Sequence, residues 1–198
     1  MSMENMVDLR LVEEPKKPMA MNAKKFGMWL FLASVMMIFM AFTSAYIVRR
    51  AEGNWVYFDL PSMFYITSIV IVVSSITMQL AYFAVKKDNH SGAKMMILIT
   101  SILGIAFLVG QFMGWGQLVT NNVYFSGGNP SGSFFYVISG LHGLHVISAI
   151  IFLLIMLTAV FTGKAYSGNM TKMEMCTTYW HFLGGLWLYL FVFLLLYR

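Results

Sequence analysis

The chain has 198 residues, of which 59% are hydrophobic and 11% are charged, and its formal net charge is +5. Five uninterrupted apolar stretches are each long enough to cross a hydrocarbon core of about 30 Å, which excludes a soluble domain. The net positive charge does not indicate nucleic-acid binding, because the basic residues flank these stretches, where positive charge normally sets topology. A single cysteine, Cys176, excludes an internal disulfide.

The first 25 residues are predicted to form a polar amino-terminal tail. They mix acidic, basic and proline residues and contain no apolar core, so they do not resemble a cleavable signal peptide. We therefore expect the first apolar stretch to act as its own insertion signal, and residues 26–198 to form one membrane domain.

The apolar stretches are predicted to be transmembrane helices. A bilayer offers no water to backbone N–H and C=O groups, so a span of this length must satisfy them internally as a helix. The sequence thus predicts an all-α integral membrane protein, a bundle of five transmembrane helices. The predicted spans are 26–48, 62–85, 95–119, 132–162 and 175–197.

Basic residues are distributed unequally between the two ends of the predicted spans. Ten Lys and Arg residues lie on the side of the amino-terminal tail, and only Arg49, Arg50 and Arg198 lie on the other. Because cytoplasmic segments carry the excess of Lys and Arg, we expect the amino terminus in the cytoplasm and the carboxyl terminus outside.

Three histidines are the only ionisable side chains of the Asp, Glu, Lys, Arg or His type inside the spans: His142, His145 and His181. Ionisable groups in a membrane are costly, so they usually mark a functional site or a structural contact. No carboxylate is available in a span to carry a proton, which argues against a proton-coupled pump built from this chain alone.

A bis-histidine haem would need His181 at the same depth as His142 or His145. The two helices run in opposite directions, and a rise of about 1.5 Å per residue separates His181 from His145 by at least about 10 Å. The simpler interpretation is that each imidazole bonds a carbonyl or hydroxyl group on the next helix. A haem b membrane anchor remains the alternative.

Uncharged polar and small residues in the spans are expected to join the helices. Gly110 with Gly114, and Ser139 with Gly143, are spaced for close backbone approach. The 18 methionines indicate adaptable packing more than copper binding. The polar residues expected to bond across helices are Ser34, Thr43, Ser74, Ser75, Thr77, Gln79 and Gln111.

Motifs in all five spans resemble subunit III of the haem-copper oxidases, the cytochrome c and quinol oxidases. The most specific are Gly140-Leu-His-Gly-Leu-His-Val146 and Tyr179-Trp-His-Phe182, the latter followed by Trp187. The order of the motifs is that of the family, and the chain resembles its short bacterial members, which lack the first two of seven helices. The other matching segments are Gly27-Met-Trp-Leu-Phe-Leu-Ala-Ser34, Ala45-Tyr-Ile47, Ser74-Ser75 and Leu103-Gly-Ile-Ala-Phe-Leu-Val-Gly-Gln111.

The resemblance implies a non-redox accessory subunit of a proton-pumping terminal oxidase in a bacterial cytoplasmic membrane. It implies direct contact with subunit I, further contacts with subunit II and other respiratory complexes, and bound phospholipid. Haem and copper are expected in partner subunits, and no catalytic, cofactor-binding or metal-binding residue is expected in this chain. The resemblance assigns structural roles to Trp29, Ser34, Ser74, Ser75, Gln111, His142, His145, Trp180, His181 and Trp187.

The sequence departs from the family pattern at three commonly acidic positions, which hold Val35, Gly114 and Gly184. We therefore hypothesise that subunit I alone serves proton entry in the complex. An accessory protein of nitric-oxide reductase is an alternative, because such proteins resemble the same five-helix family. Whether electrons come from cytochrome c or from quinol stays open, because other subunits bind the donor.

Overall fold

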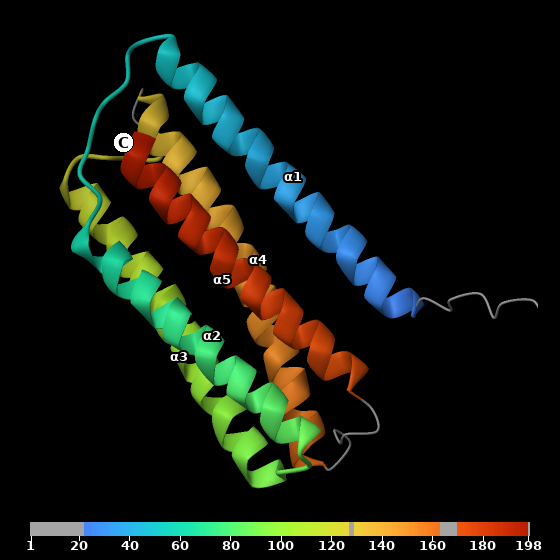
Figure 1. The fold of residues 1–198 in the computed structure, drawn as a ribbon. Helices are drawn as coiled ribbons and strands as arrows, with labels where there is room; N and C mark the ends of the chain where they lie inside the picture. The colour runs from blue at the N-terminus through green and yellow to red at the C-terminus, as the bar shows by residue number, and fades with distance from the viewer. Residues whose placement is uncertain (1–21, 127–128, 163–169, 198) are drawn as a thin grey trace, which may run out of the picture.

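A computed structural model describes residues 22–126, 129–162 and 170–197 (Figure 1). In these ranges the chain forms five helices and no strand, which confirms the predicted fold class. All five helices are long and apolar enough to span a membrane. They are α1 (Ala23–Ala51), α2 (Ser62–Lys86), α3 (His90–Thr120), α4 (Pro130–Phe161) and α5 (Thr171–Tyr197).

Three helices begin before the predicted apolar spans because asparagine side chains cap them. The side-chain oxygens of Asn22, Asn89 and Asn129 accept backbone N–H groups at the starts of α1, α3 and α4. Such caps satisfy donors that have no partner inside the helix, so the helices extend into polar sequence. Helix α1 thus begins at Ala23, inside the predicted polar tail, and residues 1–21 of that tail lie outside the described ranges.

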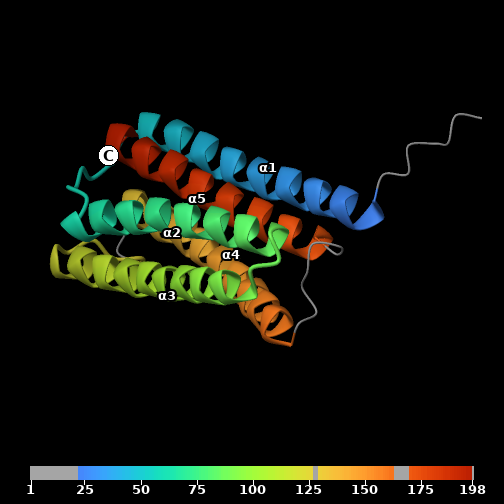
Figure 2. The ribbon, with the colours of Figure 1, turned by 60° about the horizontal axis from the view of Figure 1, so that its bottom comes forward.

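Successive helices run in opposite directions, so α1 and α5 both begin at one end of the molecule and finish at the other (Figures 1 and 2). At the first end, named here the Lys25 end, Lys25 forms an ion pair with Glu174 of α5. At the other end, named the Arg50 end, the Arg50 guanidinium lies over the rings of Tyr57 and Tyr197. The side of the membrane that each end faces stays a prediction.

Helices α2, α3, α4 and α5 form a four-helix ring, and α1 lies outside it. The closest pairing is α2 with α3, and α3–α4, α4–α5 and α5–α2 contacts complete the ring. Helix α1 packs along α4 and α5 and makes the fewest contacts of the five helices (Figures 1 and 2). One side of α1 therefore remains covered by apolar residues that face outward, including Met36, Met37 and Met40.

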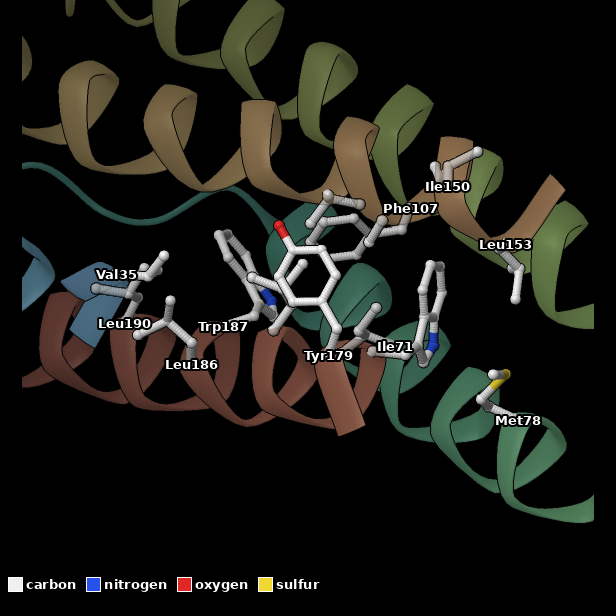
Figure 3. Close-up of a cluster of buried hydrophobic side chains, with 14 of the residues drawn as sticks. Val35, Ile71, Met78, Phe107, Ile150, Leu153, Tyr179, Leu186, Trp187 and Leu190 are labelled. Carbon is white, nitrogen blue, oxygen red and sulfur yellow. The ribbon is translucent and has the colours of Figure 1, made fainter. Parts of the chain in front are cut away.

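The interior of the bundle is apolar and aromatic (Figure 3). Phe107, Trp187 and Leu190 are completely or almost completely buried, and Val35 extends the cluster from α1 to α5. Many large apolar side chains also lie on the outside, as expected when lipid or partner helices cover the surface. Packing, and not burial away from water alone, therefore holds the helices together.

Glycines on α3 set the distance between helices. A Cβ atom at Gly114 would lie 2.7 Å from the Phe64 ring, and one at Gly110 would overlap Thr67, so the predicted close approach is confirmed for this pair. The prediction for Ser139 with Gly143 is wrong, because a Cβ at Gly143 would have no atom within 4 Å.

Candidate functional site: polar contacts inside the membrane bundle

Two tryptophans of α5 donate hydrogen bonds to serines of α2. Trp180 Nε1 lies 2.9 Å from Ser74 Oγ, and Trp187 Nε1 lies 3.0 Å from Ser68 Oγ. The tryptophans are seven residues apart and the serines are six, which is close to two turns on each of the two antiparallel helices. Both indole N–H groups are thus satisfied inside the ring, where a missing acceptor would be costly.

Helix α2 also bonds α3. The hydroxyls of Thr77 and Thr100 share a hydrogen bond of 2.8 Å, and Gln111 Nε2 donates to Thr67 Oγ1 over 3.1 Å. Together with the two tryptophan bonds, these contacts join α2 to both α3 and α5 through buried or partly buried hydrogen bonds.

The predicted cross-helix bonds are confirmed for Ser74, Thr77 and Gln111, and also for Thr43, whose hydroxyl lies 3.2 Å from that of Tyr189. The prediction is wrong for Ser34, whose hydroxyl donates to the Phe31 carbonyl of its own helix. This exposed serine has no neighbouring helix to reach. Ser75 packs against the backbone of α5, with its hydroxyl oxygen 3.1 Å from the position a Cβ would occupy at Gly184.

His181 bonds across helices as predicted. Its Nε2 lies 3.0 Å from the side-chain oxygen of Gln79 on α2, so Nε2–H is the donor. This bond fixes the imidazole close to the Lys25 end of the bundle.

His145 bonds within its own helix, so the predicted bond to the next helix is wrong for this residue. Its Nδ1 lies 2.7 Å from the Leu141 carbonyl oxygen, one turn earlier on α4. The link from this turn to α5 is made by Tyr179, whose hydroxyl bonds the Ser148 hydroxyl over 2.7 Å and the His145 carbonyl over 3.3 Å.

His142 lies among aromatic rings at the centre of the molecule. Its ring centroid is 5.3 Å from that of Trp187, 6.1 Å from Phe107 and 6.2 Å from Phe39. The side chain is 1% exposed, and neither ring nitrogen has a hydrogen-bond partner in the described part of the chain. The predicted carbonyl or hydroxyl partner of His142 is therefore wrong, because the groups packed around it are aromatic faces and edges.

The histidines lie at two levels. His142 contacts Trp187, and Trp187 is six residues from His181, or about 9 Å along α5. His181 instead contacts Gln79 at its own level. The described residues contain no group of three His, Cys, Asp or Glu side chains placed to hold a metal ion.

Close packing surrounds Val35, Gly114 and Gly184, the three positions at which the resemblance implies an acidic residue. Val35 is 1% exposed and lies in the apolar cluster near Leu190 (Figure 3). At Gly114 and Gly184 even a Cβ would press on Phe64 or Ser75. A carboxylate at any of the three would lose its hydration or displace a neighbour.

A cavity of about 400 Å³ opens at the Lys25 end between α1, α2 and α5. It contains both ends of the Lys25–Glu174 ion pair and the His181–Gln79 pair, and Trp29 forms part of its wall. Thr177 also lines it and has a buried hydroxyl oxygen without a partner in the described ranges. This lining thus combines charged, polar and aromatic side chains.

Ten motif residues were predicted to have structural roles, and in the structure they lie in several different places. Six of them lie in or beside the ring interior: Ser74, Trp180, Trp187, Gln111, His142 and His145. Ser75 packs against Gly184 of α5, His181 and Trp29 line the cavity, and Ser34 is exposed. Ser68, Thr67 and Thr100 make equally direct contacts that sequence reasoning missed. The spacing of Thr67 and Ser68 from Ser74 on α2 could have indicated those two residues, whereas Thr100 lies on α3 and pairs with Thr77 only in the folded bundle.

Comparison with known proteins identifies the family. A model of the family described as cytochrome c oxidase subunit III matches residues 54–198. The chain is 32% identical over 176 residues to a probable cytochrome c oxidase subunit 3 from Nocardia farcinica, with 86% of each chain covered. It is 28% identical to a cytochrome c oxidase subunit 3 from Alkalihalophilus pseudofirmus, covering 91% of this chain and 90% of that one.

A similar protein also occurs in an animal. The cytochrome c oxidase subunit 3 of Rhipicephalus sanguineus is 29% identical, and the match covers 88% of this chain and 70% of that one. The chain belongs to the cytochrome c oxidase subunit III family. It is a multi-pass membrane protein and, as a member of this family, an oxidase subunit that associates with other subunits in a complex.

Proposed function

We propose that this chain is a non-redox accessory subunit that stabilises the catalytic subunit I of a proton-pumping terminal oxidase in a bacterial cytoplasmic membrane. One observation carries the proposal: many polar side chains of the ring bond a neighbouring helix, with Ser68, Ser74 and Gln79 bonding residues of α5. Side chains bonded in this way stabilise the packing of the helices and are not available to bind a cofactor or to take part in catalysis.

The test compares the purified complex with and without this chain. We expect unchanged haem and copper content and initial dioxygen reduction, but a shorter active lifetime during turnover, because the catalytic subunit loses its lateral support. An absorbance spectrum of the separated chain is the second measurement. A stoichiometric Soret band, or haem loss from the complex without the chain, would overturn the accessory role.

The metal content of the partner distinguishes an oxidase from a nitric-oxide reductase. Co-purification with a copper-containing catalytic subunit supports the proposal. Co-purification with an iron-only one contradicts it.

We also propose that subunit I alone serves proton entry. The support is the close packing at Val35, Gly114 and Gly184, three positions that hold no carboxylate in this chain. Val35→Glu should leave the proton-uptake rate at neutral pH unchanged, with Val35→Gln as the control for burying a polar group. Faster or slower uptake in the glutamate variant only would contradict this assignment.

A bound phospholipid is the third part of the proposal, and the cavity at the Lys25 end is its site. A zwitterionic headgroup suits the lining, because Lys25 can face a phosphate while Glu174 faces an amine. Native mass spectrometry of the complex should find fewer retained phosphatidylethanolamine molecules in Lys25→Gln than in the control Lys24→Gln, whose side chain is exposed and outside the cavity. Equal retention would place bound lipid elsewhere.

A further inference from the structure

Two deeply buried side chains on α3 and α4 carry polar atoms that have no partner among the described residues. His142 is 1% exposed and has two such ring nitrogens, and Gln111 is 3% exposed and has one, its Oε1. The other end of the Gln111 amide is bonded, because Nε2 donates to Thr67 Oγ1. A buried polar atom normally has a partner, so these two residues need a common explanation.

The contacts of their neighbours place the two residues at about one level of the ring. Phe107, one turn before Gln111, contacts the His142 ring, and Trp115, one turn after it, donates to Ser139 Oγ over 3.1 Å. Gln111 thus lies between two α3 residues that contact the α4 turn from Ser139 to His142. Its unbonded oxygen and the imidazole belong to the same layer of the interior.

The hydroxyl and indole groups around this layer are already engaged. Ser139 Oγ donates to the Phe135 carbonyl, and Thr67 Oγ1 and Ser68 Oγ both donate to the Phe64 carbonyl. The Trp187 indole N–H donates to Ser68. Apart from His142 itself, no side chain in this layer of the described structure has a free donor for Gln111 Oε1. His142 makes no direct bond to that oxygen, so a bridging donor from outside the protein is needed.

We propose that a buried water molecule bridges Gln111 Oε1 and an imidazole nitrogen of His142. Water fits the chemistry, because one O–H can donate to the amide oxygen while the molecule accepts from, or donates to, the imidazole. Such a water would be shielded from the surface, because the Phe39, Phe107 and Trp187 rings pack around His142 and leave it 1% exposed. Buried waters typically bridge such otherwise unsatisfied groups. This hydration site is independent of the accessory role proposed above.

Water-edited solid-state NMR on the intact complex in lipid bilayers tests the site. With ¹⁵N-labelled histidine and tryptophan, magnetisation from water should reach the His142 imidazole rapidly. The reference is the Trp180 indole, which is equally buried and bonded directly to Ser74. The His142→Phe variant assigns the signal. If the His142 signal grew as slowly as that of Trp180, the interior would be dry and the proposal overturned.

Gln111→Leu tests the bridge itself. This variant removes the amide oxygen, and we expect the rapid water transfer to His142 to be lost while the subunit stays in the complex. The matched control is Gln117→Leu, six residues further along α3, where the side chain is exposed. Unchanged transfer in Gln111→Leu would show that water reaches His142 without this partner, and the bridge would be refuted. Should the leucine variant leave the complex, Gln111→Glu, which keeps an acceptor oxygen, must retain the rapid transfer.

Discussion

Helix α1 and the α2–α5 ring belong to one bundle but are held by different contacts. In the ring, glycines bring backbones close and buried hydrogen bonds cross between helices, as for Gln111 with Thr67. Helix α1 is joined mainly by aromatic contacts such as Phe39 with His142, by the Thr43–Tyr189 hydrogen bond, and by the exposed Lys25–Glu174 ion pair.

The difference predicts that the α2–α5 ring is more tightly held than α1. Close packing and buried polar contacts allow one arrangement of α2–α5, whereas α1 contacts the ring on one side and exposes apolar residues on the other. Changes in the ring should therefore cost more than changes between α1 and the ring. The predictions below test this order, from the largest effect to the smallest.

Gly104→Leu should have the largest effect. A Cβ at Gly104 would lie 2.6 Å from Cη2 of Trp180, so leucine must displace the Trp180 ring, which packs on α3 and bonds Ser74. We expect a destabilisation of about 1 to 3 kcal/mol or more, and loss of the subunit from the purified complex. Gly116→Leu on the same helix is the control, because a Cβ there has no atom within 4 Å. Equal retention of both variants would contradict close α3–α5 packing.

Ser74→Ala should come second. It leaves the buried Trp180 indole N–H without its acceptor, at a cost of about 1 to 2 kcal/mol. The midpoint temperature at which the subunit dissociates from the complex measures the effect. Ser44→Ala, on the exposed side of α1, should leave that temperature unchanged. If Ser44→Ala lowered the dissociation temperature more than Ser74→Ala, the ring would not be more tightly held than α1.

His181→Ala should destabilise the subunit by a smaller amount, about 0.6 to 1.7 kcal/mol, because it breaks the bond to Gln79, and so should lower the dissociation temperature less. The double variant with Gln79→Ala should lose less than the sum of the single changes. Additive losses would show that the pair does not interact in the complex. His145→Ala should not couple to Gln79→Ala, since His145 bonds Leu141 in its own helix.

Lys25→Gln should have the smallest effect on stability. The ion pair with Glu174 is partly exposed, so we expect about 0 to 1 kcal/mol, decreasing as salt is added. The dissociation temperature measured at low and at high salt gives the result. A loss as large as that of Ser74→Ala would mean that α1 is held as firmly as the ring.

Much of the fold could be predicted from sequence because its signals are local. The length of an apolar run is enough to predict a membrane helix, and the Gly110/Gly114 spacing correctly predicted close packing. Helix starts were misplaced because hydropathy does not register an asparagine cap such as Asn89. The identical spacing of Ser139 and Gly143 gave a wrong prediction of close packing, because the spacing does not show which side of a helix contacts a neighbouring helix.

By itself the sequence determined five helices, their alternating direction, the spans without carboxylates and the family. Each follows from composition or from the order of motifs along the chain. Only the tertiary structure decided the partners: that α2 pairs Ser74 with Trp180, that His145 bonds its own helix, and that His142 lies among aromatic rings. A partner depends on the rotation and depth of two helices relative to each other, and side chains from all of them set these together.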